Sequence, residues 1–217
     1  MNRTIIFIRH GATRLNNDDN SVDRLRGWRD IPLSDEGREE AERLGKSLKA
    51  NPPDCIVTSN LKRAVETAEI ISRIIGVKVD WKTEKFRPWD VGKYTGQLSS
   101  TAIPILLKYV DEPDRKVPDG ESFHQFQRRF FSGLDEALDK YNGVIAIVSH
   151  HRDERLLRAW ISAGHPSDGT VSMAVFKMKG EKTGSAERIS IPEEKLDLVV
   201  GEHSRMAKAA GKARKNG

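Results

Sequence analysis

The sequence predicts a single α/β domain, a three-layer α/β/α sandwich around a mostly parallel sheet. Apolar strand-like runs alternate along the chain with amphipathic helical segments, and this order is typical of βαβ units. Residues 4–8 and 144–148 are rich in β-branched and aromatic side chains, as expected of buried strands. The chain of 217 residues is long enough to cover a sheet with helices on both faces. We expect this domain to span residues 1–195.

The first half of the chain supplies three predicted strands and two helices. The strand at residues 4–8 ends at Gly11, and a polar loop follows at 14–26, where apolar side chains are too few to bury a face. Ser34, followed by two acids, is typical of a helix N-cap. Prolines at 52 and 53 end that helix. The remaining elements expected here are a strand at 55–57, a helix from 61 to 75 with one apolar face, and a strand at 77–81.

The second half begins with a loop at residues 86–96, which three residues punctuate, Pro88, Gly92 and Gly96. Helical spacing then predicts a short helix at 99–110, interrupted by a proline, and a long one at 121–141 with a phenylalanine and leucine stripe facing the core. After the strand at 144–148, the remaining elements expected are a helix around 156–161, a strong strand at 170–176 and a weak one at 187–191.

Composition limits the classes of protein to which the chain can belong. Hydrophobic residues make up 37% and charged residues 32%, and no window approaches the ~18 consecutive apolar residues of a membrane span. The N-terminal apolar run is too short for a secretory signal, so a cytoplasmic location is expected. Cys55 is the only cysteine, which excludes an internal disulfide and a cysteine-based metal site.

The net charge of +5 is concentrated at the C-terminus. Residues 205–217 hold five lysines and arginines and no acidic residue, while the rest of the chain is close to neutral. We therefore expect residues 196–217 to form a solvated, disordered basic tail. A nucleic-acid partner is not expected, although the tail leaves open a weak contact with a polyanion such as RNA.

A histidine follows the end of each of two predicted strands, and two arginines are expected near these histidines. Arg9 and His10 follow the first strand, and His150 follows the strand at 144–148. Arg63 falls in the first turn of a helix that also starts at a strand end. Ligands of open α/β sheets bind at the carboxyl ends of strands, so these four side chains suggest a phosphate pocket.

These residues lie in motifs that resemble the histidine phosphatases, also called the phosphoglycerate mutase-like superfamily. Five motifs occur in the family's order over roughly residues 4–177: Arg9-His10-Gly11-Ala12-Thr13 with Asn16; Gly27-Trp28-Arg29-Asp30-Ile31-Pro32-Leu33-Ser34 with Gly37; Ser59, Leu61, Arg63, Ala64, Thr67 and Ala68; Pro118, Gly120, Glu121 and Ser122; and Val148-Ser149-His150. Five ordered matches are far more specific than any single one.

The resemblance implies that His10 is a nucleophile that forms a phosphohistidine. It also implies that Arg9, Arg63, Asn16 and His150 bind the phosphoryl oxygens. Phosphoryl transfer requires mainly positioning and neutralisation of negative charge, and guanidinium groups supply both. With His150 protonated, three cations would surround the phosphate, so neither a metal nor another cofactor is expected.

The chain departs from the family pattern at two places. Many members carry a glutamate in the loop after the third strand, where it protonates the leaving oxygen, but this chain has Pro88 there. Asp90 is the expected substitute acid, with Glu84 and Glu121 as alternatives, because a carboxyl flanked by aromatic side chains can retain its proton. The second departure is His151-Arg152, which replaces a glycine-containing pair.

The function expected is hydrolysis of a phosphomonoester, with a small phosphorylated molecule as substrate. Thr13, Glu121, His151 and Arg152 are expected to line the substrate mouth. Two alternatives remain open: a 2,3-bisphosphoglycerate-dependent phosphoglycerate mutase, disfavoured because the interval 97–120 is short, and a catalytically weak phosphate-binding or scaffold protein. The sequence does not name the substrate or the oligomeric state.

Overall fold

The computed structural model describes residues 3–16, 22–164, 166, 169, 171–178 and 182–191. In these ranges the sheet has five strands in the order β3-β2-β4-β1-β5. Pairing is parallel between β1 and β4, β2 and β4, and β2 and β3, and antiparallel between β1 and β5. The strands are β1 (Arg3–Arg9), β2 (Cys55–Ser59), β3 (Val79–Thr83), β4 (Val144–Ser149) and β5 (Ala186–Ile191). The predicted α/β fold with a mostly parallel sheet is confirmed.

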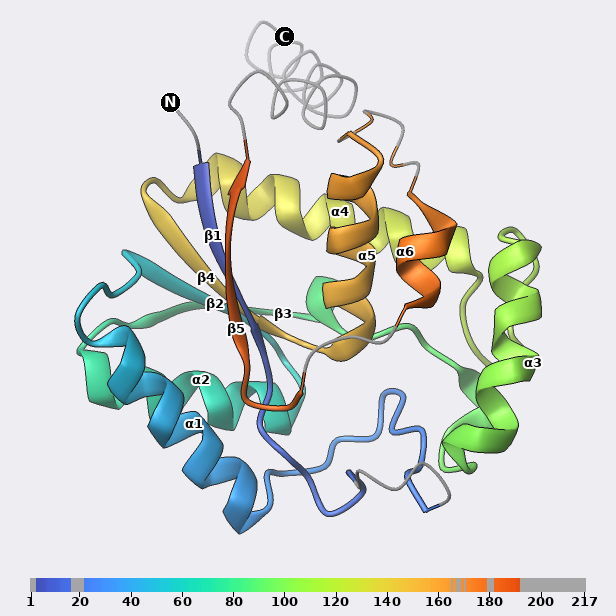
Figure 1. Ribbon diagram of the computed structural model, residues 1–217, viewed down its shortest axis with the longest axis horizontal. Helices are drawn as coiled ribbons and strands as arrows, with labels where there is room; N and C mark the ends of the chain where they lie inside the picture. Colours follow the sequence, from blue (N-terminus) through green and yellow to red (C-terminus); the bar gives the residue numbers. More distant parts are fainter. Residues whose placement is uncertain are drawn as a thin grey trace, which may run out of the picture.

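Helices cover both faces of the sheet (Figure 1). One side carries α1 (Asp35–Leu48) and α2 (Lys62–Ile75), and the other carries α4 (Phe123–Lys140) and α5 (His151–Ser162). Beside these lie α6 (Met173–Lys177), which packs on α5, and α3 (Ser99–Asp111), at the margin of the molecule. Two short 3-10 turns, η1 (Glu84–Phe86) and η2 (Gly92–Tyr94), lie between β3 and α3.

The alternation of side chains in β1 explains why its whole run is apolar. Ile6 and Ile8 pack with residues of α1 and α2, whereas Ile5 and Phe7 pack with residues of α4 and α5. All four are at most 2% exposed, because helices cover both faces of this strand. The strand that leads to His10 is therefore held rigidly inside the molecule.

The N-terminus of α1 is held tightly against the loop that follows β1. Ser34 caps the helix as predicted, accepting a hydrogen bond from the amide of Gly37. A side chain on Gly37 would collide with the carbonyl of Ala12, and one on Gly11 would collide with the carbonyl of Gly37. Only glycine fits these two positions, so the loop after β1 has one course past the helix.

One predicted strand is wrong. Within residues 171–178 the chain forms the helix α6 rather than a strand, and Phe176 is fully buried against α5 and α4. Its β-branched composition favoured a strand, but the open edge of the sheet beside β1 is occupied by β5. The weak strand predicted at 187–191 is confirmed there, and tertiary pairing has overridden local propensity in both segments. The predicted tail, 196–217, lies outside the described residues, as does 17–21 of the polar loop.

Candidate phosphoryl-transfer site

His10 is buried immediately after β1, with its ring fixed by the main chain. Its side chain is 3% exposed, and Nδ1 lies 2.7 Å from the carbonyl oxygen of Gly11. A carbonyl only accepts hydrogen bonds, so the proton is on Nδ1 and the lone pair is on Nε2. Burial lowers the pKa of His10 well below its usual range, and the charges of Arg63 and Arg9 lower it further. The imidazole is therefore neutral near pH 7, with an unprotonated nitrogen.

His150 reaches the same point from the neighbouring strand. Arg9 pairs with Ser149 across β1 and β4, so the residues that follow them lie side by side. The His10 and His150 rings lie edge to face, with centroids 5.0 Å apart and an interplanar angle of 63°. His150 is 2% exposed and is the residue that precedes the first turn of α5. The two strand ends thus deliver both predicted histidines to one location.

Hydrogen bonds also fix the protonation of His150. Its Nδ1 faces Nε of Arg63 at 3.3 Å, and its Nε2 faces the hydroxyl of Ser59 at 2.9 Å. The guanidinium can only donate, so Nδ1 is the acceptor and the proton is on Nε2. Burial, Arg63 and His10 together lower the pKa of His150 well below its usual range. In this arrangement His150 is neutral and is not the third cation considered from the sequence.

Arg63 holds three groups at once. Besides His150, it donates to the carbonyl oxygens of Arg29 at 2.8 Å and Gly27 at 3.0 Å. The side chain is 1% exposed and lies in the first turn of α2, where nearby negative charge is favoured. Three of its five N–H groups are used in this way, which leaves two for a bound anion. Burial lowers the pKa of Arg63, but the guanidinium stays charged at neutral pH.

Arg9 and Asn16 complete the predicted phosphate-binding set with different degrees of attachment. The positive charge of Arg9 contributes to the lowered pKa of His10, which places it close to the ring. Asn16 accepts hydrogen bonds from the amide and the hydroxyl of Thr13, both at 2.9 Å. Its oxygen therefore shapes the loop after β1, and only its NH₂ group is left to donate.

The three candidate acids lie in different places: Asp90 in the loop between η1 and α3, Glu121 in contact with that loop, and Glu84 at the start of η1. One carboxylate oxygen of Asp90 accepts from the amide of Gly92 at 3.1 Å, while Glu121 binds the amide of Asp90 at 3.0 Å. Glu84 is paired with Arg87 on the surface. Within the described chain, no hydrogen bond joins Asp90 to His10, His150 or Arg63.

Arg129, on α4, was not singled out from the sequence, although it organises this loop. It donates to the carbonyl oxygens of Glu84, Lys85, Arg87 and Pro88 and forms an ion pair with Glu121 at 2.5 Å. Trp28 also donates to the carbonyl of Pro88, at 2.8 Å. These bonds fix the main chain around Pro88, the position at which the resemblance to the family would place a glutamate. No motif spacing in the sequence points to Arg129.

Asp153 is a second residue that sequence reasoning missed. It is fully buried on α5, with one carboxyl oxygen 2.7 Å from the hydroxyl of Ser149 and the other without a partner in the described chain. Ser149 also donates to the carbonyl of Phe86 at 3.0 Å. Burial raises the pKa of Asp153 well above its usual range. A protonated Asp153 can donate to Ser149 while Ser149 donates to Phe86, so all three groups are consistent.

Arg26 is the third missed residue, directly before the Gly27-Trp28 motif. It bonds the carbonyl of Leu15 and the carboxylate of Asp23, both at 3.0 Å. Its positive charge contributes to the lowered pKa values of His10 and His150, so it lies in the neighbourhood of both rings. Its place in a polar loop gave no signal that this arginine faces inward.

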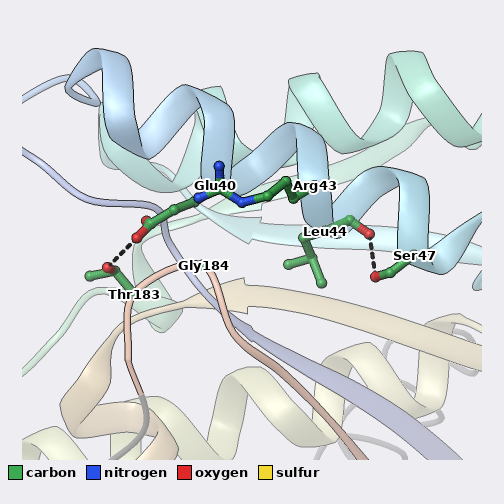
Figure 2. Close-up of a pocket in the computed structure, with 6 residues that line it drawn as sticks. All are labelled: Glu40, Arg43, Leu44, Ser47, Thr183 and Gly184. Carbon is green, nitrogen blue, oxygen red and sulfur yellow. Dashed lines mark hydrogen bonds between the residues drawn. The ribbon is translucent and has the colours of Figure 1, made fainter.

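A separate hollow of about 360 Å³ lies between α1 and the turn before β5 (Figure 2). Its border includes Glu40, one oxygen of which accepts from Thr183 at 2.9 Å while the other accepts from the amide of Ala12 at 2.7 Å. The amide of Gly184 donates to the carbonyl of His10 at 3.2 Å. Two residues at the border of the hollow, Glu40 and Gly184, therefore bind the main chain of the loop that contains His10.

Neither a membrane span nor a metal cluster is found in the described parts of the chain. None of the helices there is long and apolar enough to cross a membrane. Within the same ranges, no group of three or more histidine, cysteine, aspartate or glutamate side chains is arranged to hold a metal ion.

Comparison with known proteins agrees with this geometry. The family model described as the histidine phosphatase superfamily, branch 1, matches residues 5–182. The chain is 31% identical over 163 residues to the uncharacterized phosphatase PhoE of Bacillus subtilis (strain 168), a match that covers 75% of this chain and 79% of that protein. It is 29% identical over 152 residues to the probable phosphoglycerate mutase GpmB of Cronobacter sakazakii, which covers 68% of each.

Solved structures share the fold. A protein of Thermus thermophilus superposes with a TM-score of 0.62 at 26% identity, covering 86% of this chain and 92% of that one. A mycobacterial glucosyl-3-phosphoglycerate phosphatase, solved in complex with VO3, superposes with a TM-score of 0.67 over the same shares. Its sequence is 23% identical, so this second likeness concerns the fold alone.

Proposed function

The chain belongs to the histidine phosphatase superfamily, branch 1, and from this membership we propose that it is a metal-independent phosphomonoester hydrolase that acts through a phosphohistidine. The observation that carries the proposal is the protonation of His10. Its Nδ1 proton is engaged by the carbonyl of Gly11, so Nε2 is free to attack phosphorus. Membership of the family supports the same role for His10, because the family motif implies that this histidine is the nucleophile.

The proposed first step transfers the phosphoryl group to the enzyme. The Nε2 lone pair of His10 forms a bond to phosphorus while the bond from phosphorus to the ester oxygen breaks. That oxygen leaves with the electron pair and takes a proton from a carboxylic acid, for which Asp90 is our candidate. Splitting the hydrolysis in this way replaces one difficult displacement with two easier ones.

The second step releases phosphate. Water attacks the phosphohistidine, the nitrogen–phosphorus bond breaks, and its electrons return to Nε2 of His10. The carboxylate formed in the first step accepts the proton that the water loses, and orthophosphate departs. The acid is thereby restored for the next substrate.

Arg9 and Arg63 are proposed to stabilise the charge that spreads over the phosphoryl oxygens. The guanidinium of Arg63 is held in place before the substrate arrives, so it requires no reorganisation during the reaction. Asn16 can add a neutral hydrogen bond from its NH₂ group, because only its oxygen is engaged by Thr13. A bound dianion would also raise the pKa of His150, and the imidazole can then take up a proton as negative charge approaches.

Similarity to both phosphatases and probable phosphoglycerate mutases leaves a mutase as the alternative. The interval 97–120 argues for hydrolysis, because it is short and α3 is the one helix in its described structure. The mutases that the chain resembles are expected to have a longer insertion at this place. A mutase must retain its phosphohistidine long enough to return the phosphoryl group to a sugar acid, and a short segment in this interval supplies less chain to exclude water during that time.

One experiment separates the three possibilities. The protein is incubated with an aryl phosphate, and separately with 3-phosphoglycerate, in the presence of a chelator. Hydrolysis predicts phosphate release from the aryl ester, a trapped phosphohistidine, and loss of both in His10→Ala. Interconversion of phosphoglycerate isomers that greatly exceeds phosphate release would identify a mutase. The absence of any turnover or labelling by the wild type would indicate a binding protein.

A further inference from the structure

Two arginines on α5, Arg152 and Arg155, form no ion pair in the described chain, unlike Arg26, Arg129 and Arg158. Arg152 and Arg155 are three residues apart and therefore lie on the same side of the helix. Within the described ranges, neither guanidinium group forms a hydrogen bond or an ion pair, and Nε of Arg155 is buried without a hydrogen-bond partner, although the negative charge of Glu154 acts on Arg155. Arg158, one turn further on, pairs with both Glu154 and Glu187.

Aromatic rings hold these two guanidinium groups in place. Arg152 lies over the ring of Trp89, 5.5 Å from its centroid, and Arg155 lies over the ring of Phe176 at 5.3 Å. Both rings are essentially buried, so the two cations rest on apolar supports rather than extending freely into water. Such contacts compensate only part of the cost of taking a cation out of water. The guanidinium groups of Arg152 and Arg155 are therefore held in position and keep N–H groups with which an anion could form hydrogen bonds.

The pair adjoins the proposed phosphate-binding residues. His151 is close enough to both groups to feel their charges. Burial lowers its pKa to about 2, and the positive charges of Arg9, Arg152, Arg155 and Arg26 lower it further, in that order. Arg9 and Arg26 also influence His10, so one continuous positive region extends from the phosphate site to the first turns of α5. His151 is neutral there and does not add to the charge.

We propose that Arg152 and Arg155 form a second anion-binding subsite, so that the substrate is a phosphomonoester that also carries a carboxylate or a second phosphate. This inference rests on the proposed function, because it names the class of molecule that occupies the same site. A planar guanidinium is suited to paired hydrogen bonds with either group. The dipeptide His151-Arg152, which departs from the family pattern, is thereby given a role in substrate choice.

Binding is tested first, without turnover. Calorimetry on the wild-type protein compares 4-carboxybenzylphosphonate with 4-carbamoylbenzylphosphonate, and the 3-substituted pair in parallel. The members of each pair are similar in shape and differ in charge. We expect the carboxylate to bind about 10- to 100-fold more tightly, and orthophosphate to compete with it. Equal affinities within both pairs would overturn the subsite.

Variants then locate the preference. Arg152→Gln and Arg155→Gln should each reduce the ratio of the two affinities toward one, whereas Arg158→Gln on the same helix should leave it unchanged. If the Gln variants keep the wild-type ratio, the two arginines only support packing and the proposal fails. Thermal unfolding of each variant shows that it is folded, and Arg152→Lys, which retains charge, should keep part of the preference.

Turnover of the matching 4-carboxyphenyl and 4-carbamoylphenyl phosphates separates this inference from the proposed function. If neither ester is hydrolysed but the phosphonate preference persists, the hydrolase proposal fails and the subsite stands. If both are hydrolysed and the ratio of kcat/KM values does not change in Arg152→Gln or Arg155→Gln, the subsite fails and the hydrolase proposal stands.

Discussion

Arg63 donates from Nε to Nδ1 of His150 at 3.3 Å, so a residue of α2 determines which nitrogen of the histidine that follows β4 carries the proton. The same guanidinium also ties down the turn at Gly27 and Arg29. Charge, ring orientation and loop position therefore depend on one side chain. Its replacement should have effects that loss of a surface cation would not.

Arg63→Lys is expected to lower kcat/KM for an aryl phosphate by about 10²–10³-fold. An ammonium group keeps the charge but lacks the planar fork that meets His150 and two carbonyls together. Steady-state kinetics measure the change, and Arg73→Lys, an exposed residue in the last turn of the same helix, is the matched control. A decrease no larger than that of the control would show that charge alone matters at this position.

The pH profile of kcat/KM should show its acidic limb below pH 6.5. Burial lowers the pKa of both His10 and His150, so both rings remain neutral as the pH falls through the ordinary range of histidine. Activity that needs the lone pair of His10 is present above its lowered pKa and is lost only as pH falls through it. The substrate should be an aryl phosphate whose second pKa lies below 6.5, so that its own ionisation cannot produce a limb at or above that pH. A limb at or above pH 6.5 would contradict the neutral assignment.

Asp153→Asn should make the protein more stable, increasingly so as pH rises. The folded pKa of Asp153 is raised, chiefly by burial, so the wild type loses stability as pH rises from the unfolded value of about 3.9 through the folded one. Asparagine resembles the protonated acid and still donates to Ser149. Urea unfolding should give a gain of about 1 kcal/mol or more at pH 8 and little at pH 4.

The control for that experiment is Asp80→Asn, an exposed position on β3. It should change the unfolding free energy at pH 8 by less than Asp153→Asn does. A pH-independent effect of Asp153→Asn would mean that folding does not raise the pKa of this carboxyl, and it would contradict the prediction.

The proposed acid is tested with leaving groups of different basicity. If Asp90 protonates the departing oxygen, Asp90→Asn should slow alkyl phosphates by about 10²-fold or more while affecting nitrophenyl phosphate little, because nitrophenolate leaves without help. Glu121→Gln is run beside it, since Glu121 holds the amide of Asp90. A selective loss in Glu121→Gln with none in Asp90→Asn would transfer the role to Glu121.

The sequence predicted the parts of the fold that depend on local pattern. The buried strand before His10, the cap at Ser34 and the long helix with its phenylalanine stripe all appear as expected. These features are visible in a sequence because periodicity and capping are short-range. The segment now seen as α6 was misassigned because its burial against α5 depends on residues far away in the chain.

The candidate site was predictable to the same extent and no further. Motifs identified His10, His150 and Arg63, which the fold brings together. They gave no hint of Arg129, Asp153 or Arg26, because each acts through contacts between segments distant in the sequence. Protonation states were also out of reach, since they depend on burial and on single hydrogen bonds.

The position of β1 between β4 and β5 has a consequence for how the protein is made. A ribosome completes β1 first, but its two neighbours in the sheet emerge only after residues 149 and 191 have been added. Until then, the nascent chain carries an unpaired and strongly apolar segment, a hazard for self-association during synthesis. The strand that leads to His10 is thus synthesised well before either of the strands with which it pairs.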